Sequence, residues 1–78
     1  MPFVNVRTAK GLLDASQKQE LHQRLTEVLV EVEGRGKAAF RSLVIVLIEE
    51  EEPTSWSLGG KPVTAAQLEA LIGALHVS

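Results

Sequence analysis

The chain has 78 residues, a formal net charge of −2 at pH 7 and no cysteine. Its length predicts a single domain, residues 1–78, with a core so small that association with other chains is needed to stabilise it. The lack of cysteine excludes disulfides and thiolate metal sites, and we expect no metal and no other cofactor. The slightly acidic balance, without a basic stripe between aromatic residues, argues against a nucleic-acid partner.

Membrane association and export are not expected from the sequence either. The longest uncharged apolar run, residues 43–48, is far too short to span a bilayer. The first residues lack a charged segment followed by a long apolar block, so we expect no signal peptide. The expectation is a soluble, cytoplasmic protein.

The N-terminal segment is predicted to be a strand that begins next to a proline. Residues 3–8 alternate between apolar and polar side chains until Gly11 interrupts the pattern. The alternation places three residues on one face: Pro2, Val4 and Val6. Bacterial methionine aminopeptidase readily removes a Met that precedes proline, so the mature chain would begin with a free secondary amine.

An amine in this position is suited to acid–base chemistry. A free α-amino group titrates near ~7.7–8.0 in model peptides, and burial among apolar side chains lowers the pKa. A neutral amine can take a proton from carbon next to a carbonyl and return it elsewhere, so Pro2 is the candidate catalytic residue. The alternative is purely structural, because proline is tolerated as the first residue of a strand.

A long amphipathic helix follows. Two registers fit its N-cap: Asp14 with Gln17, or Ser16 with Gln19. Apolar residues then recur with helical spacing: Leu21, Leu25, Val28, Leu29 and Val32. The pattern ends at residues 34–36, Gly-Arg-Gly, where a glycine can take the left-handed conformation that closes a helix.

Residues 43–48 form a continuous aliphatic run, which predicts a second strand buried on both faces, as in a parallel sheet. Strand, long helix and strand together predict a β-α-β unit in a protein of the α+β class. One helix covers only one face of a two-stranded sheet, so we expect another copy of the chain to cover the other face.

The C-terminal third is predicted to contain a turn, a hairpin and a helix. The four glutamates 49–52 are typical of a solvated turn, and residues 57–61 predict a tight hairpin or return loop. Thr64 and Gln67 form a capping box that begins a short C-terminal helix. Either the chain's own sheet or a neighbouring chain would cover its apolar side: Leu68, Leu71, Ile72 and Leu75.

The order and spacing of these segments resemble the 4-oxalocrotonate tautomerase family. The resemblance runs from residue 2 to about 61 and consists of Met1-Pro2-Phe3-Val4-Asn5-Val6, the Lys10-Gly11 turn, Asp14…Gln17-Lys18, the strand ending Ile48-Glu49-Glu50, and Pro53…Trp56-Ser57-Leu58-Gly59-Gly60-Lys61. It implies tautomerase-like β-α-β protomers that pair through a four-stranded sheet into a homo-oligomer. A hexamer is favoured over a dimer, although the C-terminal helix is similar to that of a dimeric branch.

The resemblance also implies a function. The family's isomerases move a proton between enol and keto forms of 2-oxo acids. Pro2 matches the catalytic proline, and Trp56 matches the aromatic position that lines the substrate pocket. A small-molecule 2-oxo acid or enol is therefore the expected partner.

The cations of the family are not at the matching positions. The best-known member has an arginine after the turn and another on the second strand, where this chain has Leu12 and Ile45. Arg41, four residues before Ile45 and of the same strand parity, is the candidate substrate-binding cation if the strand extends that far. Other cations could reach a pocket: Arg7, Lys10, Arg35, Lys37 and Lys61. A monocarboxylate or aromatic enol is the expected substrate, in preference to a dicarboxylate.

The missing arginines favour a second hypothesis, in which the fold is kept for a non-catalytic oligomer that binds a small anion or serves in assembly. Retention of Met1 in cells would support it, because Pro2 would then be an amide without a basic nitrogen.

Overall fold

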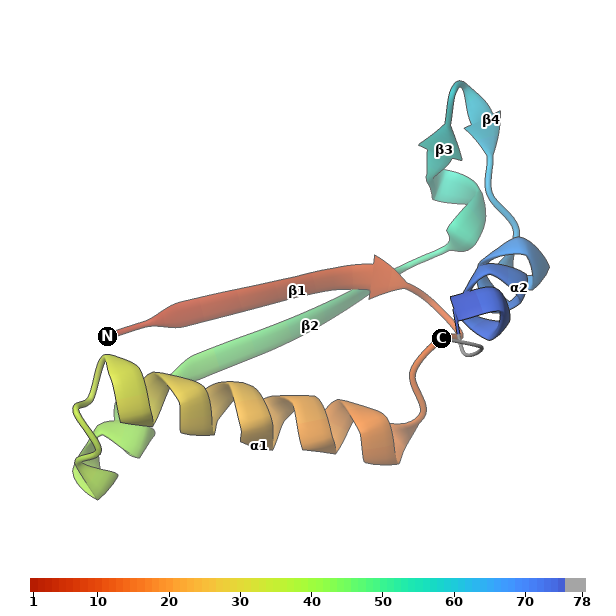
Figure 1. The fold of residues 1–78 in the computed structure, drawn as a ribbon. Coiled ribbons are helices and arrows are strands. Elements are labelled where there is room, and N and C mark those ends of the chain that lie inside the picture. The colour runs from red at the N-terminus through yellow and green to blue at the C-terminus, as the bar shows by residue number, and fades with distance from the viewer. Residues whose placement is uncertain (76–78) are drawn as a thin grey trace. The chain divides into compact units, whose positions relative to one another are not determined.

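The computed structural model describes residues 1–75 of the chain. Two long strands, β1 (Phe3–Ala9) and β2 (Ile45–Glu51), are separated in sequence by helix α1 (Ala15–Val32), and they pair with each other (Figure 1). The pairing is parallel, because the Ile45 N–H donates to the Pro2 carbonyl (3.1 Å) near their first residues and the Lys10 N–H donates to the Glu51 carbonyl (2.7 Å) near their last. The predicted β-α-β arrangement and the α+β class are confirmed.

The chain forms two compact units, and both long strands contribute to each. The first unit comprises Met1–Val6 and Leu13–Glu49; the second comprises Arg7–Leu12 and the chain from Glu50 onward. In the first unit, β1 alternates as predicted, with Pro2, Val4 and Val6 half-buried between exposed neighbours.

Helix α1 begins at the first of the two predicted cap registers. The Asp14 carboxylate accepts a hydrogen bond from the Gln17 N–H (2.8 Å), and the Gln17 side-chain oxygen accepts one from the Asp14 N–H (2.9 Å). Each residue thus satisfies a backbone donor that the first helical turn leaves unpaired. The register that starts at Ser16 is wrong.

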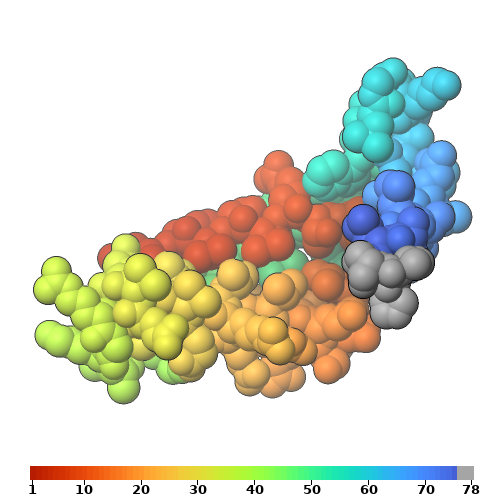
Figure 2. Space-filling view, viewed as in Figure 1, coloured from red at the N-terminus to blue at the C-terminus, as the bar shows by residue number. Residues whose placement is uncertain are grey.

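The covered face of α1 differs from the predicted apolar stripe. Val30, outside the stripe, is buried at 6% exposure, whereas Val28 and Val32 are 53% and 74% exposed. The half-buried members of the stripe are Leu21, Leu25 and Leu29. Two strands can cover only a narrow band of a helix, so the side chains at one edge of the stripe remain exposed to solvent. Much of the α1 surface is accessible in Figure 2.

The connection after α1 reverses the chain tightly. Arg35 and Gly36 have positive φ angles of 54° and 77°, and the Gly36 N–H donates to the Val30 carbonyl (2.9 Å), which closes the helix as predicted. Gly34 is buried, and a Cβ there would lie 2.6 Å from Cγ of Phe40. The Phe40 side chain therefore packs directly on the Gly34 backbone.

Strand β2 lies later in the sequence than predicted. Residues Ala38–Leu43 form a 3₁₀ helix, so the strand begins at Ile45 and continues to Glu51. The prediction of a solvated turn is therefore wrong for three of the four glutamates. The Asn5 amide on β1 donates to the Glu49 carboxylate, which gives that acid a partner beside the strand.

One face of this strand pair is open in the single chain. Phe3, Ile45 and Leu47 are all exposed large hydrophobic residues, and they alternate with half-buried neighbours along their strands. The expectation that another copy covers this face stays a prediction.

The second unit contains the predicted hairpin and C-terminal helix. Strands β3 (Ser57–Leu58) and β4 (Lys61–Pro62) pair antiparallel around Gly59 and Gly60, whose positive φ angles suit a two-residue turn. Helix α2 (Ala65–Leu75) starts at the predicted capping box: the Thr64 N–H donates to the Gln67 side chain (2.9 Å), and the Gln67 N–H donates back to Thr64 Oγ1 (3.2 Å).

The apolar side of α2 is mostly uncovered in the single chain, since Leu71, Ile72 and Leu75 are exposed and Leu68 is half-buried. Within residues 1–75, no helix combines the length and hydrophobicity that a bilayer crossing requires.

Candidate active site

Pro2 is fixed at the start of β1 through its carbonyl group. That carbonyl accepts the hydrogen bond from the Ile45 N–H, and the proline ring is half-buried, whereas Met1 before it is 82% exposed. The backbone nitrogen of proline carries no N–H when it is an amide, so it takes no part in strand pairing. Cleavage after Met1 would turn this nitrogen into a secondary amine on a residue already held in the sheet.

Trp56 lies in the second unit, directly after the short 3₁₀ helix Pro53–Ser55. It is 38% exposed, and its carbonyl accepts the Val63 N–H (3.0 Å), which ties it to the chain leaving the hairpin. Trp56 lines a hollow of about 280 Å³ in this unit, which we call the apolar hollow. The other residues that line it are Arg7, Thr8, Ala9, Leu12, Ser57, Leu58, Val63 and Leu68.

A second, more polar hollow shares two of these residues. Arg7 and Trp56 line it together with Glu51 and Ser55, and its volume is about 420 Å³. Arg7 and Trp56 are thus the two residues that the lining of both hollows has in common. This arrangement puts a cation beside the aromatic residue that the sequence predicted as a pocket wall.

Arg41 is not on the second strand, and the premise that linked it to Ile45 is wrong. It belongs to the 3₁₀ helix Ala38–Leu43, because the chain has not yet entered β2 at this point. Its guanidinium forms an ion pair with Glu27 of α1. The hollow around it is lined by Gln23, Arg24, Glu27 and Val28, and Pro2 is not among the lining residues.

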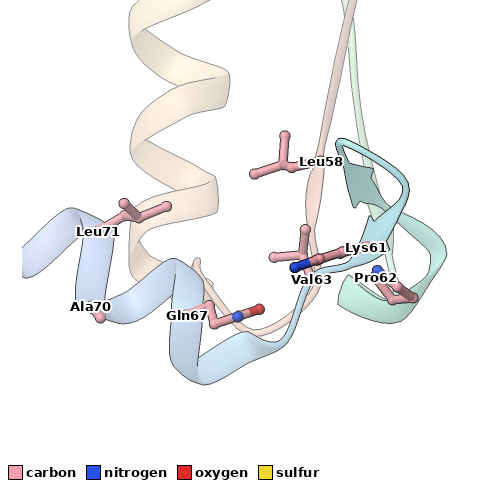
Figure 3. A pocket seen from close by; sticks show the side chains of 7 residues that line it. All are labelled: Leu58, Lys61, Pro62, Val63, Gln67, Ala70 and Leu71. Carbon is pink, nitrogen blue, oxygen red and sulfur yellow. The ribbon is translucent and has the colours of Figure 1, made fainter.

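A third hollow of the second unit lies between the hairpin and α2. Its volume is about 450 Å³, and Figure 3 shows Leu58, Val63 and Leu71 around the space, with Lys61 on the hairpin side. Its remaining lining residues are Pro62, Gln67 and Ala70. The hollow is mainly aliphatic and has a lysine as its cation, without an aromatic residue.

Within residues 1–75, no three His, Asp or Glu side chains gather as a group that could hold a metal ion. His22 is exposed on α1, and His76 lies outside the described residues.

Arg7 lines two hollows with Trp56, and sequence reasoning does not single it out. The sequence offers it only as one of several cations, because nothing local distinguishes an arginine on an alternating strand. Its proximity to Trp56 results from the parallel pairing of β1 with β2, which brings the residues after Glu50 back to the end of β1. This register joins distant segments, so no local sequence signal marks Arg7.

Comparison with known proteins agrees with this architecture. Residues 2–66 match the family model for tautomerase enzymes. The chain is 37% identical over 70 residues to probable tautomerase K2 of Dickeya dadantii. The alignment covers 90% of this chain and 98% of that protein. It is also 34% identical over 70 residues to probable tautomerase Cj0270 of Campylobacter jejuni. That alignment covers 90% of this chain and 97% of the Campylobacter protein.

The solved structures similar to this chain include TomN, a 4-oxalocrotonate tautomerase homologue in the tomaymycin biosynthetic pathway. The TM-score is 0.68 at 28% identity, over 88% of this chain and 95% of TomN. The family match and the names of these relatives support an isomerase of the tautomerase type. The chain belongs to the tautomerase family.

Proposed function

We propose that this protein moves a proton between the enol and keto forms of 2-oxo acids, and that the amine of Pro2, freed by removal of Met1, is the general base. The neutral nitrogen takes the proton from the enol hydroxyl. The protonated nitrogen then delivers a proton to a carbon of the conjugated system, which leaves a carbonyl group and returns the amine to its neutral form. The cycle balances without a cofactor.

The observation that carries this proposal is the setting of Pro2. The residue is half-buried and anchored by its carbonyl, while the methionine before it is exposed and within reach of an aminopeptidase. The match to the family begins at residue 2, which also supports a functional role for the mature N-terminus. We propose that Trp56 lines the substrate pocket, as its wall position in the two adjoining hollows supports.

The test measures ketonisation of phenylenolpyruvate and 2-hydroxymuconate by protein whose N-terminus has been verified by mass spectrometry. Processed wild-type protein should exceed the buffer rate, and Pro2→Ala should lower the excess by about 10²–10⁴-fold, the usual contribution of a positioned base. Pro62→Ala, which changes an exposed proline of β4, is the matched control. Equal rates for wild type and Pro2→Ala would falsify the proposal.

A second variant tests the nitrogen itself. A chain with an uncleaved N-terminal extension keeps every residue but leaves Pro2 as an amide, and it should lack the excess rate. Full activity of this chain would rule out the Pro2 amine as the base. Quantitative retention of Met1 in cells would instead support the non-catalytic, anion-binding hypothesis.

A further inference from the structure

We propose that two copies of this chain pair reciprocally through their hairpins and C-terminal helices. Helix α2 of each copy lies along the hollow between the hairpin and α2 of the other, so that Glu69 of one copy meets Lys61 of the second. The interface uses residues of the second unit, whereas the open strand face of Phe3, Ile45 and Leu47 belongs to the first. It is independent of the proposed reaction.

Helix α2 is apolar on all sides, yet the single chain leaves it exposed. Apart from Gln67 and Glu69, its 11 residues are alanine, leucine, isoleucine or glycine. A helix that is hydrophobic all round is normally buried on several sides. In the single chain, however, Leu68 is half-buried and the rest of α2 is exposed, with Leu75 at 73%. A partner therefore has to cover α2 on more than one side.

The hollow and Glu69 lie on opposite sides of α2. Gln67, Ala70 and Leu71 line the hollow. Successive residues of an α-helix are about 100° apart around the axis, which places Glu69 about 160° from both Gln67 and Leu71. Ile72 lies beside Glu69 on this outer side.

This geometry allows a reciprocal pair. When α2 of a second copy lies along the hollow, its own hollow side faces the first copy's α2, and its outer side faces the first copy's hairpin. The same contacts form with the two copies exchanged, so the pair closes as an isologous dimer. Each α2 is then covered on two opposite sides.

The hairpin offers a surface that matches the outer side of α2. Leu58 is 68% exposed where it lines the hollow, and Figure 3 shows the Lys61 nitrogen directed into the space between the hairpin and α2. A cavity of about 150 Å³ holds a benzene molecule, so about 450 Å³ takes about two or three large side chains of an entering helix. In the pair, Ile72 of the second copy packs against Leu58.

Charge complementarity identifies a second copy as the partner. Between Pro53 and Leu75 the chain has two charged side chains, Lys61 and Glu69, of opposite sign. In the described part of the chain, neither side chain takes part in a hydrogen bond or an ion pair. Each copy thus supplies the charge that the other lacks, and the pair forms two ion pairs between copies.

Other ways of covering α2 fit less well. Helices that lie in a membrane interface have a polar face rich in lysine and arginine opposite their apolar face, whereas α2 has one acid and no cation. Packing on the chain's own sheet would cover one side of α2 and leave the opposite side in water.

Introduced cysteines test the contact directly, because the chain has none of its own. Isotope-labelled Lys61→Cys and unlabelled Glu69→Cys are unfolded together in urea, refolded and oxidised, and intact mass identifies the products. We expect the mixed disulfide to form at least about tenfold faster than either homodisulfide, because a disulfide needs Cα atoms within about 7 Å and the pair keeps identical positions far apart. Arg24→Cys, at an exposed position of the first unit, is the matched control for Lys61→Cys.

Charge reversal tests the ion pairs. In a Leu47→Lys background, which disables the open strand face, sedimentation equilibrium should still give a mass of two 8.5 kDa chains. Adding Lys61→Glu or Glu69→Lys should weaken this pair by about 5- to 30-fold, since two ion pairs are lost and like charges face each other. An equimolar mixture of the two reversed chains should recover the affinity. Arg24→Gln should leave it unchanged.

Four results would overturn the inference: a mixed disulfide no faster than with Arg24→Cys, a monomer in the Leu47→Lys background at micromolar concentration, unchanged affinity after both charge reversals, or no recovery in their mixture. None of these measurements involves turnover or Pro2. The interface and the proposed base therefore stand or fail separately.

Discussion

Replacement of Gly34 by alanine should destabilise the protein, although the backbone at this position permits alanine. The new Cβ would lie 2.6 Å from Phe40 Cγ and 2.7 Å from Phe40 Cβ and Cδ2. Carbon atoms normally approach to about 3.5–4.0 Å, so the ring has to move by about 1 Å. The contacted atoms lie at the base of the side chain, so a simple rotation of the ring does not relieve the clash.

The magnitude follows from two opposing effects. Overpacking costs about 1–3 kcal/mol, and the reduced freedom of the unfolded chain returns about 0.4–1 kcal/mol when glycine becomes alanine. We expect a net loss of about 1–2 kcal/mol in the free energy of unfolding. Urea unfolding followed by far-UV circular dichroism measures it, at one fixed protein concentration because association shifts apparent stability.

Two further variants isolate the clash. In a Phe40→Ala background, the same Gly34→Ala change should be neutral or stabilising, because the opposing ring is gone. Gly73→Ala is the matched control, since a Cβ built there on α2 meets nothing within 4 Å beyond its chain neighbours and the helix's own backbone, and it should stabilise the chain. Unchanged or raised stability of Gly34→Ala in the wild-type background would refute the packing argument.

Three other predictions follow from the fold and the proposed base. Asp14→Ala removes the α1 cap and should lower the free energy of unfolding by about 1 kcal/mol in urea titrations, whereas no change would contradict the capping role. Sedimentation equilibrium at micromolar concentration should give a mass well above one 8.5 kDa chain, and Leu47→Lys on the open face of β2 should reduce it; a wild-type monomer would contradict this. For the processed enzyme, kcat/KM should fall about tenfold per pH unit below the pKa of the Pro2 amine, because only the neutral amine accepts a proton; a flat profile down to pH 5 would exclude this base.

Local signals in the sequence predict local structure well. The alternation around Val4 identifies β1, and the Thr64 cap lies where α2 begins. Both depend on side chains within a few residues of one another. The reverse turn after α1 is also predictable, because glycine at positive φ is a local preference.

Features that depend on distant parts of the chain are predicted less well. The sequence places the start of β2 too early, because aliphatic Leu43 extends the run although it belongs to a 3₁₀ helix. The strand continues through acids that composition assigns to a turn, since pairing with β1 decides where it ends. The sequence places Arg41 on this strand for the same reason: parity assumes a continuous strand and cannot show where that strand begins.

The exposure of Met1 and the carbonyl anchor of Pro2 have a joint consequence for maturation. The hydrogen bond to Ile45 uses an atom that remains after the first residue is cut away, and the lost residue had little buried surface. We therefore expect removal of Met1 to change the Pro2 nitrogen from an amide to an amine without changing the fold. Circular dichroism or a melting curve should not tell a purification-tagged preparation from a native one, and intact mass is the measurement that separates them.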